Sequence, residues 1–410
     1  MLWKIIALAV AGLVSGGVFA QSNVTVSGNM KLNFDSISAG GATNGLTHVS
    51  RTRVSDNNSN IKFAGEESLG NGNTAFFFIE SAVGTDNDAG TAYGQNNPIK
   101  GTTIGSRDTG VGIKGSWGSV DLGKFSVQYP AMANIETAGI ADSLHMATSS
   151  LNLFTGAGLS TILRLQNSIR YNSPKFSGFG GTLVYSTGNG SFSESATNGT
   201  PNKENAWNLR LAYDNGPINA THAHHRSNNT GAIAASNVCL STAGAISQSV
   251  AACPAGTVAI AALGLSNGTD IRSDRLGGAY TFPMGLKVGL IWDNTKNTAK
   301  TTGVETKRKA WALPLTYTMG ANRFSFTYGK ANNLNTAGAD VADSETKMTM
   351  LGYEYAMSKR TSLTAQWVAL NNGSAGTNDF WHAANNVSGG GAVTAGSDPR
   401  LFSLGVHHKF

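Results

Sequence analysis

The sequence has few charged residues and no long apolar segment beyond its first twenty residues. Charged side chains make up 13% of the 410 residues, about half the share found in an average soluble protein. This low charge disfavours a soluble protein with a solvated surface. A helical membrane protein is also excluded, because it needs stretches of about 20 apolar residues. The remaining way to meet lipid is a closed sheet with one apolar face.

Cysteine is scarce as well. Cys239 and Cys253 are the only two, and neither lies in a CxxC motif or beside a histidine. A catalytic or metal-binding role for them is therefore disfavoured. Two cysteines in an exported protein are expected to be oxidised, so we predict one disulfide between Cys239 and Cys253 that closes a small loop.

The first twenty residues are typical of an export signal. Lys4 supplies the positive charge, Ile5 to Val14 the apolar centre, and Val18-Phe19-Ala20 a small-residue cleavage site. An uncleaved membrane anchor is the alternative, and the apolar run is short for one. We predict residues 1–20 as a signal peptide and residues 21–410 as the mature protein.

The chain is basic, but its cations are dispersed. The formal net charge is +6, and Lys4 is the only charged residue of the predicted signal, which leaves +5 on the mature chain. Nucleic-acid binding requires a denser basic patch. The expected partners are small hydrophilic solutes, anions, outer-membrane lipid and the phosphate groups of lipopolysaccharide, and no nucleic acid.

Both ends of the mature chain alternate in polarity. From Val24 to Phe34 the even-numbered positions are apolar or glycine and the odd-numbered ones are polar, and Phe402 to Phe410 alternates similarly. A period of two is that of a strand with one apolar and one wet face. A soluble sandwich shows the same alternation. Only the length and the repetition of the pattern can distinguish a membrane barrel from a soluble sandwich.

Tight turns alternate with long polar connections between these ends, as in outer-membrane barrels. Pro283-Met284-Gly285 and Ser358-Lys359-Arg360 are turns, whereas residues 294–307 and 371–399 are long connections. The pattern predicts strands at residues 24–35, 55–67, 74–84, 106–115, 118–126, 162–173, 181–190, 204–214, 218–227, 271–281, 285–294, 308–318, 322–332, 347–356, 361–371 and 400–410. We therefore predict an all-β fold, a transmembrane antiparallel β-barrel of about sixteen strands, or about fourteen or eighteen if one hairpin is miscounted. Such a barrel is too wide for side chains to fill, so water enters it.

Five segments carry motifs in a fixed order along the mature chain. They are SNIKFAGEESLGNGNTAFFFIES (59–81), SRDTGVGIKGSWGSVDLGK (106–124), RLQNSIRYNSPKFSG (164–178), LGYEYAMSKRT (351–361) and the terminal GVHHKF. Together they resemble the trimeric general porins of β-proteobacteria, a family of the Gram-negative porin superfamily. The resemblance implies a homotrimer in the cell outer membrane of a Gram-negative bacterium, with a third long loop folded inward.

The pore candidates are charges that face water, because porin selectivity is electrostatic. A cation that faced lipid at the midplane would cost roughly 2–4 kcal/mol. Alternation then places both arginines of residues 162–173 on one luminal face, along with two lysines, and Lys124 is added from its place in the family motif, where Arg is usual. The predicted basic wall is Lys62, Lys114, Lys124, Arg164 and Arg170.

The resemblance implies that residues 126–161 form the constriction loop, whose acidic residues are Glu136 and Asp142. A basic wall opposite an acidic loop would produce a transverse field across the lumen. The alternative is that each charge is only a solvated luminal residue paired with an acid such as Glu66. The family usually has basic residues where this chain has Asn60 and Ala64, which leaves the strength of anion preference open.

We therefore predict an outer-membrane porin, a passive diffusion channel for small hydrophilic solutes and ions with a mild anion preference. A substrate-specific channel for organic acids or phosphate is the alternative, and residues 228–270 are a predicted long extracellular loop. No GxSxG, HExxH or P-loop motif with supporting context occurs, so we predict no enzyme, catalytic residue or cofactor. His222, His224 and His225 resemble a metal patch, but alternation points the last two to opposite faces, so no metal site is predicted.

Overall fold

The computed structural model describes residues 23–56, 59–84, 104–127, 135, 164–188, 205–229, 237–241, 246–249, 257–260, 269–300, 302–380, 387 and 393–410. No helix within these ranges is long and apolar enough to cross a membrane. The described residues form strands joined by turns and loops. The strands are β1 (Asn23–Gly40), β2 (His48–Asp56), β3 (Asn60–Gly70), β4 (Asn73–Ala82), β5 (Thr109–Gly115), β6 (Gly118–Ser126), β7 (Arg164–Asn172), β8 (Phe179–Ser186), β9 (Asn205–Asn215), β10 (Ile218–Asn229), β11 (Asn237–Ser241), β12 (Ile246–Ser249), β13 (Thr257–Ile260), β14 (Thr269–Thr281), β15 (Leu286–Ala299), β16 (Glu305–Met319), β17 (Asn322–Ala331), β18 (Asn335–Thr336), β19 (Ala339–Asp340), β20 (Thr346–Ala356), β21 (Thr361–Asn372) and β22 (Asp398–Lys409).

Nineteen of these strands form one antiparallel sheet that closes on itself. The sheet closes because the first half of β1 pairs with β3 while β22 pairs with its other edge. β2 continues the line of β3 along the second half of β1, and β18 and β19 form a small hairpin beside β16. The described residues thus form a closed wall of sixteen strands, in the order β1, β3 to β10, β14 to β17 and β20 to β22. This confirms the predicted strand count.

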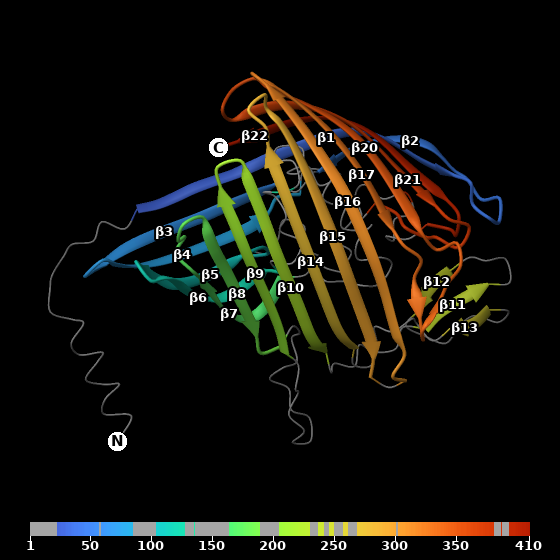
Figure 1. Cartoon of the computed structure of the whole chain (residues 1–410), viewed down its shortest axis with the longest axis horizontal. Helices are drawn as coiled ribbons and strands as arrows, with labels where there is room; N and C mark the ends of the chain where they lie inside the picture. Colours follow the sequence, from blue (N-terminus) through green and yellow to red (C-terminus); the bar gives the residue numbers. More distant parts are fainter. Residues whose placement is uncertain are drawn as a thin grey trace.

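The wall is uneven in height. The strands β14 to β16 have 13 to 15 residues, whereas β5 to β8 have only 7 to 9. The long strands lie side by side in one part of the wall and the short strands in another (Figure 1). Turns join the strands at one end of the barrel; in one of them, Asn71 and Gly72 both have positive φ, the backbone of a tight hairpin that twists with its strands.

Side chains alternate between the two faces of the wall. Leu122, Leu351 and Leu404 are each about half exposed and point outward, at 57%, 51% and 47%. Asp121 and Ser403, each one residue before an outward leucine, are completely buried on the inner face. An apolar outer face and a polar inner face are what a barrel in lipid requires, because apolar side chains then meet the acyl chains.

Apolar residues cover one part of the inner face. Phe380, Val387 and Val393, from the connection between β21 and β22, pack with inward residues of the long strands such as Leu370 and Leu401. This packing fixes part of the connection against the wall.

Ile135 belongs to the connection between β6 and β7, of which Val127 and Ile135 are the described residues. It is 1% exposed and lies beside Gly289 of β15, where a Cβ atom would be 3.2 Å from its Cγ2 and 3.0 Å from Pro314. The strands β7 to β10 and β14 lie between β6 and β15 along the wall. Ile135 therefore contacts a part of the inner face remote from the strand that precedes it.

Several predictions concern residues outside the described ranges. The predicted signal peptide, residues 1–20, and most of the predicted constriction loop lie there. Residues 228–270 begin at the end of β10 and reach the start of β14, and β11, β12 and β13 form a separate small sheet between them. Cys253 lies outside the described residues and only the backbone of Cys239, in β11, is described, so the disulfide stays a prediction.

The seam between β1 and β22 depends on a residue without a side chain. Gly28 and Phe410 exchange two backbone hydrogen bonds, of 3.0 and 3.1 Å. A Cβ atom on Gly28 would lie 2.4 Å from the Asn60 carbonyl oxygen and 2.6 Å from the Phe410 ring. Gly28→Val should therefore destabilise the barrel by about 1–3 kcal/mol, the usual cost of overpacking.

Urea unfolding of the refolded protein in detergent measures this cost. Gly40→Val, at the other end of β1, is the matched control, because nothing lies within 4 Å of a Cβ atom there; its effect should stay within about 0.5 kcal/mol. Equal unfolding midpoints for the two variants would contradict the role given to Gly28.

Candidate functional site

Three phenylalanine side chains lie in a line on the inner face. Phe76 and Phe78 belong to β4 and Phe125 to β6. The ring centroid of Phe78 is 6.3 Å from that of Phe76 and 6.2 Å from that of Phe125. Phe77, between the first two, is 37% exposed on the outer face. We call Phe76, Phe78 and Phe125 the phenylalanine row.

Arg170 of β7 lies over this row and against a buried acid. Its guanidinium carbon is 4.1 Å from the centroid of Phe125 and 5.5 Å from that of Phe78. Its Nη2 donates to Asp121 Oδ2 at 2.6 Å, and its Nε to the same oxygen at 3.1 Å. The Asp121 side chain is fully buried and that of Arg170 is 16% exposed. A paired charge stacked on rings is held in one orientation.

Two lysines also lie over the row. Lys62 Nζ of β3 is 5.1 Å from the centroid of Phe78, and Lys114 Nζ of β5 is 5.9 Å from that of Phe76. Lys114 also bonds to Glu66 Oε1 at 2.5 Å. Lys62 has no carboxylate partner within ion-pair distance among the described residues. Because a phenyl ring carries no net charge, its contact leaves the Lys62 charge uncancelled.

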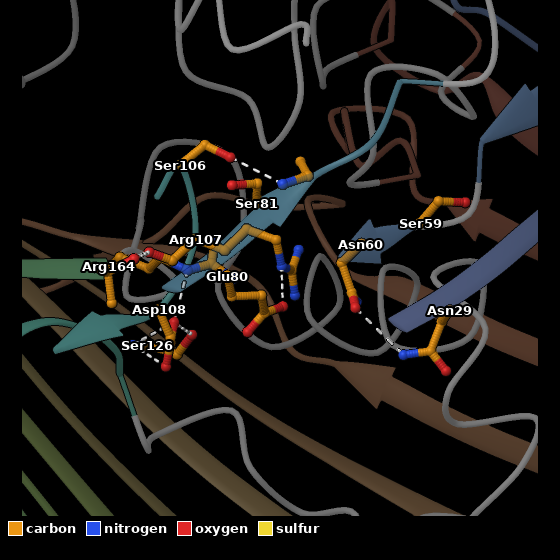
Figure 2. A network of polar contacts seen from close by, with 12 residues as sticks. Asn29, Ser59, Asn60, Glu80, Ser81, Ser106, Arg107, Asp108, Ser126 and Arg164 are labelled. Carbon is orange, nitrogen blue, oxygen red and sulfur yellow. Dashed lines mark hydrogen bonds and ion pairs between the residues drawn. The ribbon is translucent and has the colours of Figure 1, made fainter. Parts of the chain in front are cut away.

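A further luminal cation comes from the segment that precedes β5. The Arg107 Nε atom donates to Glu80 Oε1, and the backbones of Arg107 and Glu80 are bonded as well. Figure 2 shows the Arg107 side chain extended along Glu80. Glu80 is the register partner of Lys62. Sequence reasoning left the direction of Arg107 open, because Arg107 breaks the alternation of the predicted strand 106–115; in the structure it precedes β5, which begins at Thr109.

The strand β7 does not alternate strictly, since the register between β6 and β7 shifts between Gly123 and Phe125. Asn167 has a φ of 48°, the mark of an extra residue in the strand, a β-bulge. Leu165 is 1% exposed and packs with Phe125 on the inner face, whereas Ile169 is 44% exposed on the outer face. The extra residue of the bulge reverses the alternation, so side chains before it and after it that are an even number of positions apart point to opposite faces.

Arg164 and Arg170 therefore lie on opposite faces of the wall. Arg164 pairs with Ser126, the residue after the inward Phe125. Lys124 pairs with Thr109 on that same outer face and lines a shallow hollow with the outward Leu122. This corrects the predicted basic wall, in which Arg164 and Lys124 face the lumen; the physical reason is the bulge.

An ionic cluster holds these outer residues. Arg164 Nε donates to Asp108 Oδ1 at 2.8 Å, Ser126 Oγ donates to the same oxygen at 2.6 Å, and Lys124 Nζ bonds to the Gly105 carbonyl at 2.6 Å. Figure 2 shows Asp108 between Ser126 and Arg164. Burial raises the pKa of the Asp108 carboxyl, but the Arg164 charge and the Ser126 hydrogen bonds outweigh it and hold that pKa below its ordinary value.

The structure thus brings Lys62, Lys114 and Arg170 of the predicted wall together around the phenylalanine row. Glu136 and Asp142 of the predicted acidic loop lie outside the described residues. Sequence reasoning missed Phe76, Phe78 and Phe125 as luminal residues. Their signal was present, since Phe76 and Phe78 flank the outward Phe77 in alternation, but apolar residues were assigned to the lipid face.

The histidines of β10 divide between the two faces, as alternation predicts. His225 is 4% exposed on the inner face. His222 and His224 point outward, and their ring nitrogens lie 3.3 and 2.8 Å from the same oxygen of Asp274. Within the described ranges no group of three histidine, cysteine or acidic residues is arranged to hold a metal ion.

Comparison with known proteins finds relatives in sequence and structures of similar fold. The chain is 26% identical over 410 residues to outer membrane porin protein 32 of Delftia acidovorans, covering 99% of each chain. Its fold is similar to that of an anion-selective porin from Comamonas acidovorans, with a TM-score of 0.66, 22% identity and coverage of 95% and 100%. It is also similar to the trimer form of the outer membrane protein OmpT of Vibrio cholerae, with a TM-score of 0.65, 12% identity and coverage of 95% and 99%.

The family model for Gram-negative porins matches residues 7–376. The closed wall of antiparallel strands, with its apolar outer face, agrees with that match and with the outer membrane as the site of the protein. The chain belongs to the Gram-negative porin family.

Proposed function

We propose that this protein is a passive channel for small hydrophilic solutes and ions with a mild preference for anions. The luminal charges around the phenylalanine row support this proposal. Arg107, Lys114 and Arg170 each face one carboxylate, from Glu80, Glu66 and Asp121 respectively. Lys62 is the fourth cation and lies over Phe78. One uncancelled positive charge favours anions and repels cations weakly, which is the basis for a mild preference.

The proposed constriction loop, residues 126–161, would narrow the lumen opposite this wall. The contact of Ile135 with Gly289 supports an inward course, because Gly289 lies on the inner face of β15. Glu136 directly follows Ile135 in the chain. We propose that Glu136 and Asp142 supply the acidic side of a transverse field and that Lys62, Arg107, Lys114 and Arg170 supply the basic side.

This function needs binding and orientation only, so we propose a channel and not an enzyme, with no cofactor. A homotrimer is proposed from the family resemblance, and outer-membrane lipid, including lipopolysaccharide, would surround the assembly. Single-channel recording in planar bilayers tests the proposal directly. Ohmic single-channel steps with a chloride-over-potassium permeability ratio somewhat above one are the expected result, and absence of conductance would overturn the proposal.

The alternative is a channel specific for organic acids or phosphate, and the same recordings distinguish it. Adding dicarboxylates or inorganic phosphate at millimolar concentration should reduce the chloride current of a general porin only weakly. A strong block by one of these anions would replace the general channel with a specific one.

Replacing Lys62 should weaken the anion preference. One unit charge about 8 Å from the path of a permeating ion changes the energy of that ion by roughly 0.5 kcal/mol in water. Lys62→Gln should therefore lower the chloride-over-potassium permeability ratio roughly twofold. The effect should shrink in 1 M salt, where screening is strong. Lys124→Gln removes the same charge from the outer face and is the control. Equal changes in the two variants would show that Lys62 has no special place in the lumen.

Replacing Asp121 should act in the opposite direction. Asp121→Asn removes the carboxylate that cancels the Arg170 charge, so the chloride-over-potassium ratio should rise. The same change should lower the free energy of unfolding by about 1.5–3 kcal/mol, because a hydrogen bond to a charged group is lost. Glu67→Gln makes the same chemical change at an exposed position of β3 and should alter neither quantity. A lower ratio in Asp121→Asn would contradict the assignment.

A further inference from the structure

A row of cations crosses six neighbouring strands on the outer face of the barrel. Each side chain is exposed or half-buried, and each stands next to at least one buried residue of the inner face. The strands involved are β10, β14, β15, β16, β17 and β20, which are consecutive in the wall. The members, called here the outer basic row, are Arg226, Arg272, Lys296, Lys307, Lys309, Lys330 and Lys347.

The register of the strands places six of these seven cations in like-charge pairs, whereas Lys309 pairs with Asn294. Arg226 pairs with Arg272, Arg272 with Lys296, and Lys296 with Lys307. Farther along, Lys330 of β17 pairs with Lys347 of β20. Residues opposite each other on neighbouring strands are about 5 Å apart, and like charges in such pairs are destabilising.

Few ion pairs among the described residues offset this repulsion, although Asp340, Asp343 and Glu345 line a hollow together with Lys307, Lys309 and Lys330. Glu305 contacts both Lys296 and Lys307, so one carboxylate serves two cations. Lys309, Lys330 and Lys347 have no carboxylate within ion-pair distance among the described residues. A repeated arrangement of unfavourable pairs is most simply stabilised by an anion from outside the chain, and several negative groups are needed to match its length.

The row lies at the boundary between apolar and polar parts of the outer face. Trp311 of β16 pairs directly with Lys330, and Trp207 of β9 pairs with Arg226. Aromatic belts mark the level of the lipid head groups in barrels of this kind. The row is near the end of the barrel that carries the long connections, which is the extracellular end when short turns are periplasmic. Phosphate groups of the outer leaflet lie at this level.

We propose that the outer basic row binds the phosphate groups of lipopolysaccharide, and that Lys309, Lys330 and Lys347 are its central contacts. The ligand chemistry is a set of phosphate groups held side by side, as on a glycolipid in the outer leaflet. The inference deepens the proposed function by assigning the lipid partner to particular residues. It rests on the outer-membrane location and not on conduction through the lumen.

The test is binding of purified lipopolysaccharide to the full-length, folded protein in neutral detergent. A basic residue near an anionic lipid surface is worth about 1 kcal/mol, so Lys330→Gln with Lys347→Gln should bind about 30-fold more weakly. Lys359→Gln with Arg360→Gln is the matched control, because it removes two charges from an exposed turn at the opposite end of the barrel; its affinity should stay unchanged. Unchanged binding in the first variant, or an equal loss in both, would overturn the proposal.

Two further readouts keep the test independent of folding and of channel function. Without lipopolysaccharide, Lys330→Gln with Lys347→Gln should unfold at a higher temperature than the unmodified protein, because a like-charge pair is removed. Added lipopolysaccharide should raise the unfolding temperature of the unmodified protein more than that of the variant. Inorganic phosphate at the same phosphate concentration should not reproduce this shift; if it does, the row is a site for free phosphate. The chloride-over-potassium ratio should remain that of the unmodified protein, and a changed ratio with unchanged lipid binding would overturn the assignment.

Discussion

The rest of the structure depends on the need to satisfy every backbone hydrogen bond in a medium without water. A sheet with a free edge cannot meet this need in lipid, so the pairing of β1 with both β3 and β22 is the decisive contact. Closure then imposes the other features. Each strand has one face toward lipid and one toward the lumen, which favours charges on the inner wall or near the strand ends. Apolar residues also occur on the inner face, where the phenylalanine row supports neighbouring charges and a second cluster packs the connection between β21 and β22.

The luminal charges show how a wide barrel obtains a weak field. Around the phenylalanine row, carboxylates neutralise three of the four cations, and Asp121 is held in the wall so that its charge acts mainly on Arg170. Phe78 does something different for Lys62, because a ring attracts a cation without cancelling its charge. In this arrangement, selectivity depends on whether each cation contacts a carboxylate or a phenyl ring more than on the number of lysines and arginines. A count of basic residues would therefore overestimate the preference.

Alternation in the sequence was enough to predict the strands and the inward position of Lys62, because β3 has no irregularity around that residue. It failed for Arg164, since the bulge at Asn167 depends on a backbone conformation that no residue pattern announced. The pairing of Arg170 with Asp121 joins residues 49 positions apart, and it follows from register, which becomes known only when the strands are aligned. Arg107 breaks the alternation of the predicted strand 106–115, so periodicity gave it no direction, and in the structure it lies before β5. Glu136, Asp142 and the pair Cys239 and Cys253 remain predictions.

The bulge in β7 also separates two uses of the same kind of residue. Arg170 contributes to the water-filled interior, while Arg164, six residues earlier, belongs to a cluster on the outside with Asp108 and Ser126. Deleting or inserting one amino acid in such a strand would transfer every side chain on one side of the change to the other compartment without altering composition. Small length changes are therefore a more abrupt route to a new permeability than point substitutions, and equally a route by which a charge could be relocated into the bilayer.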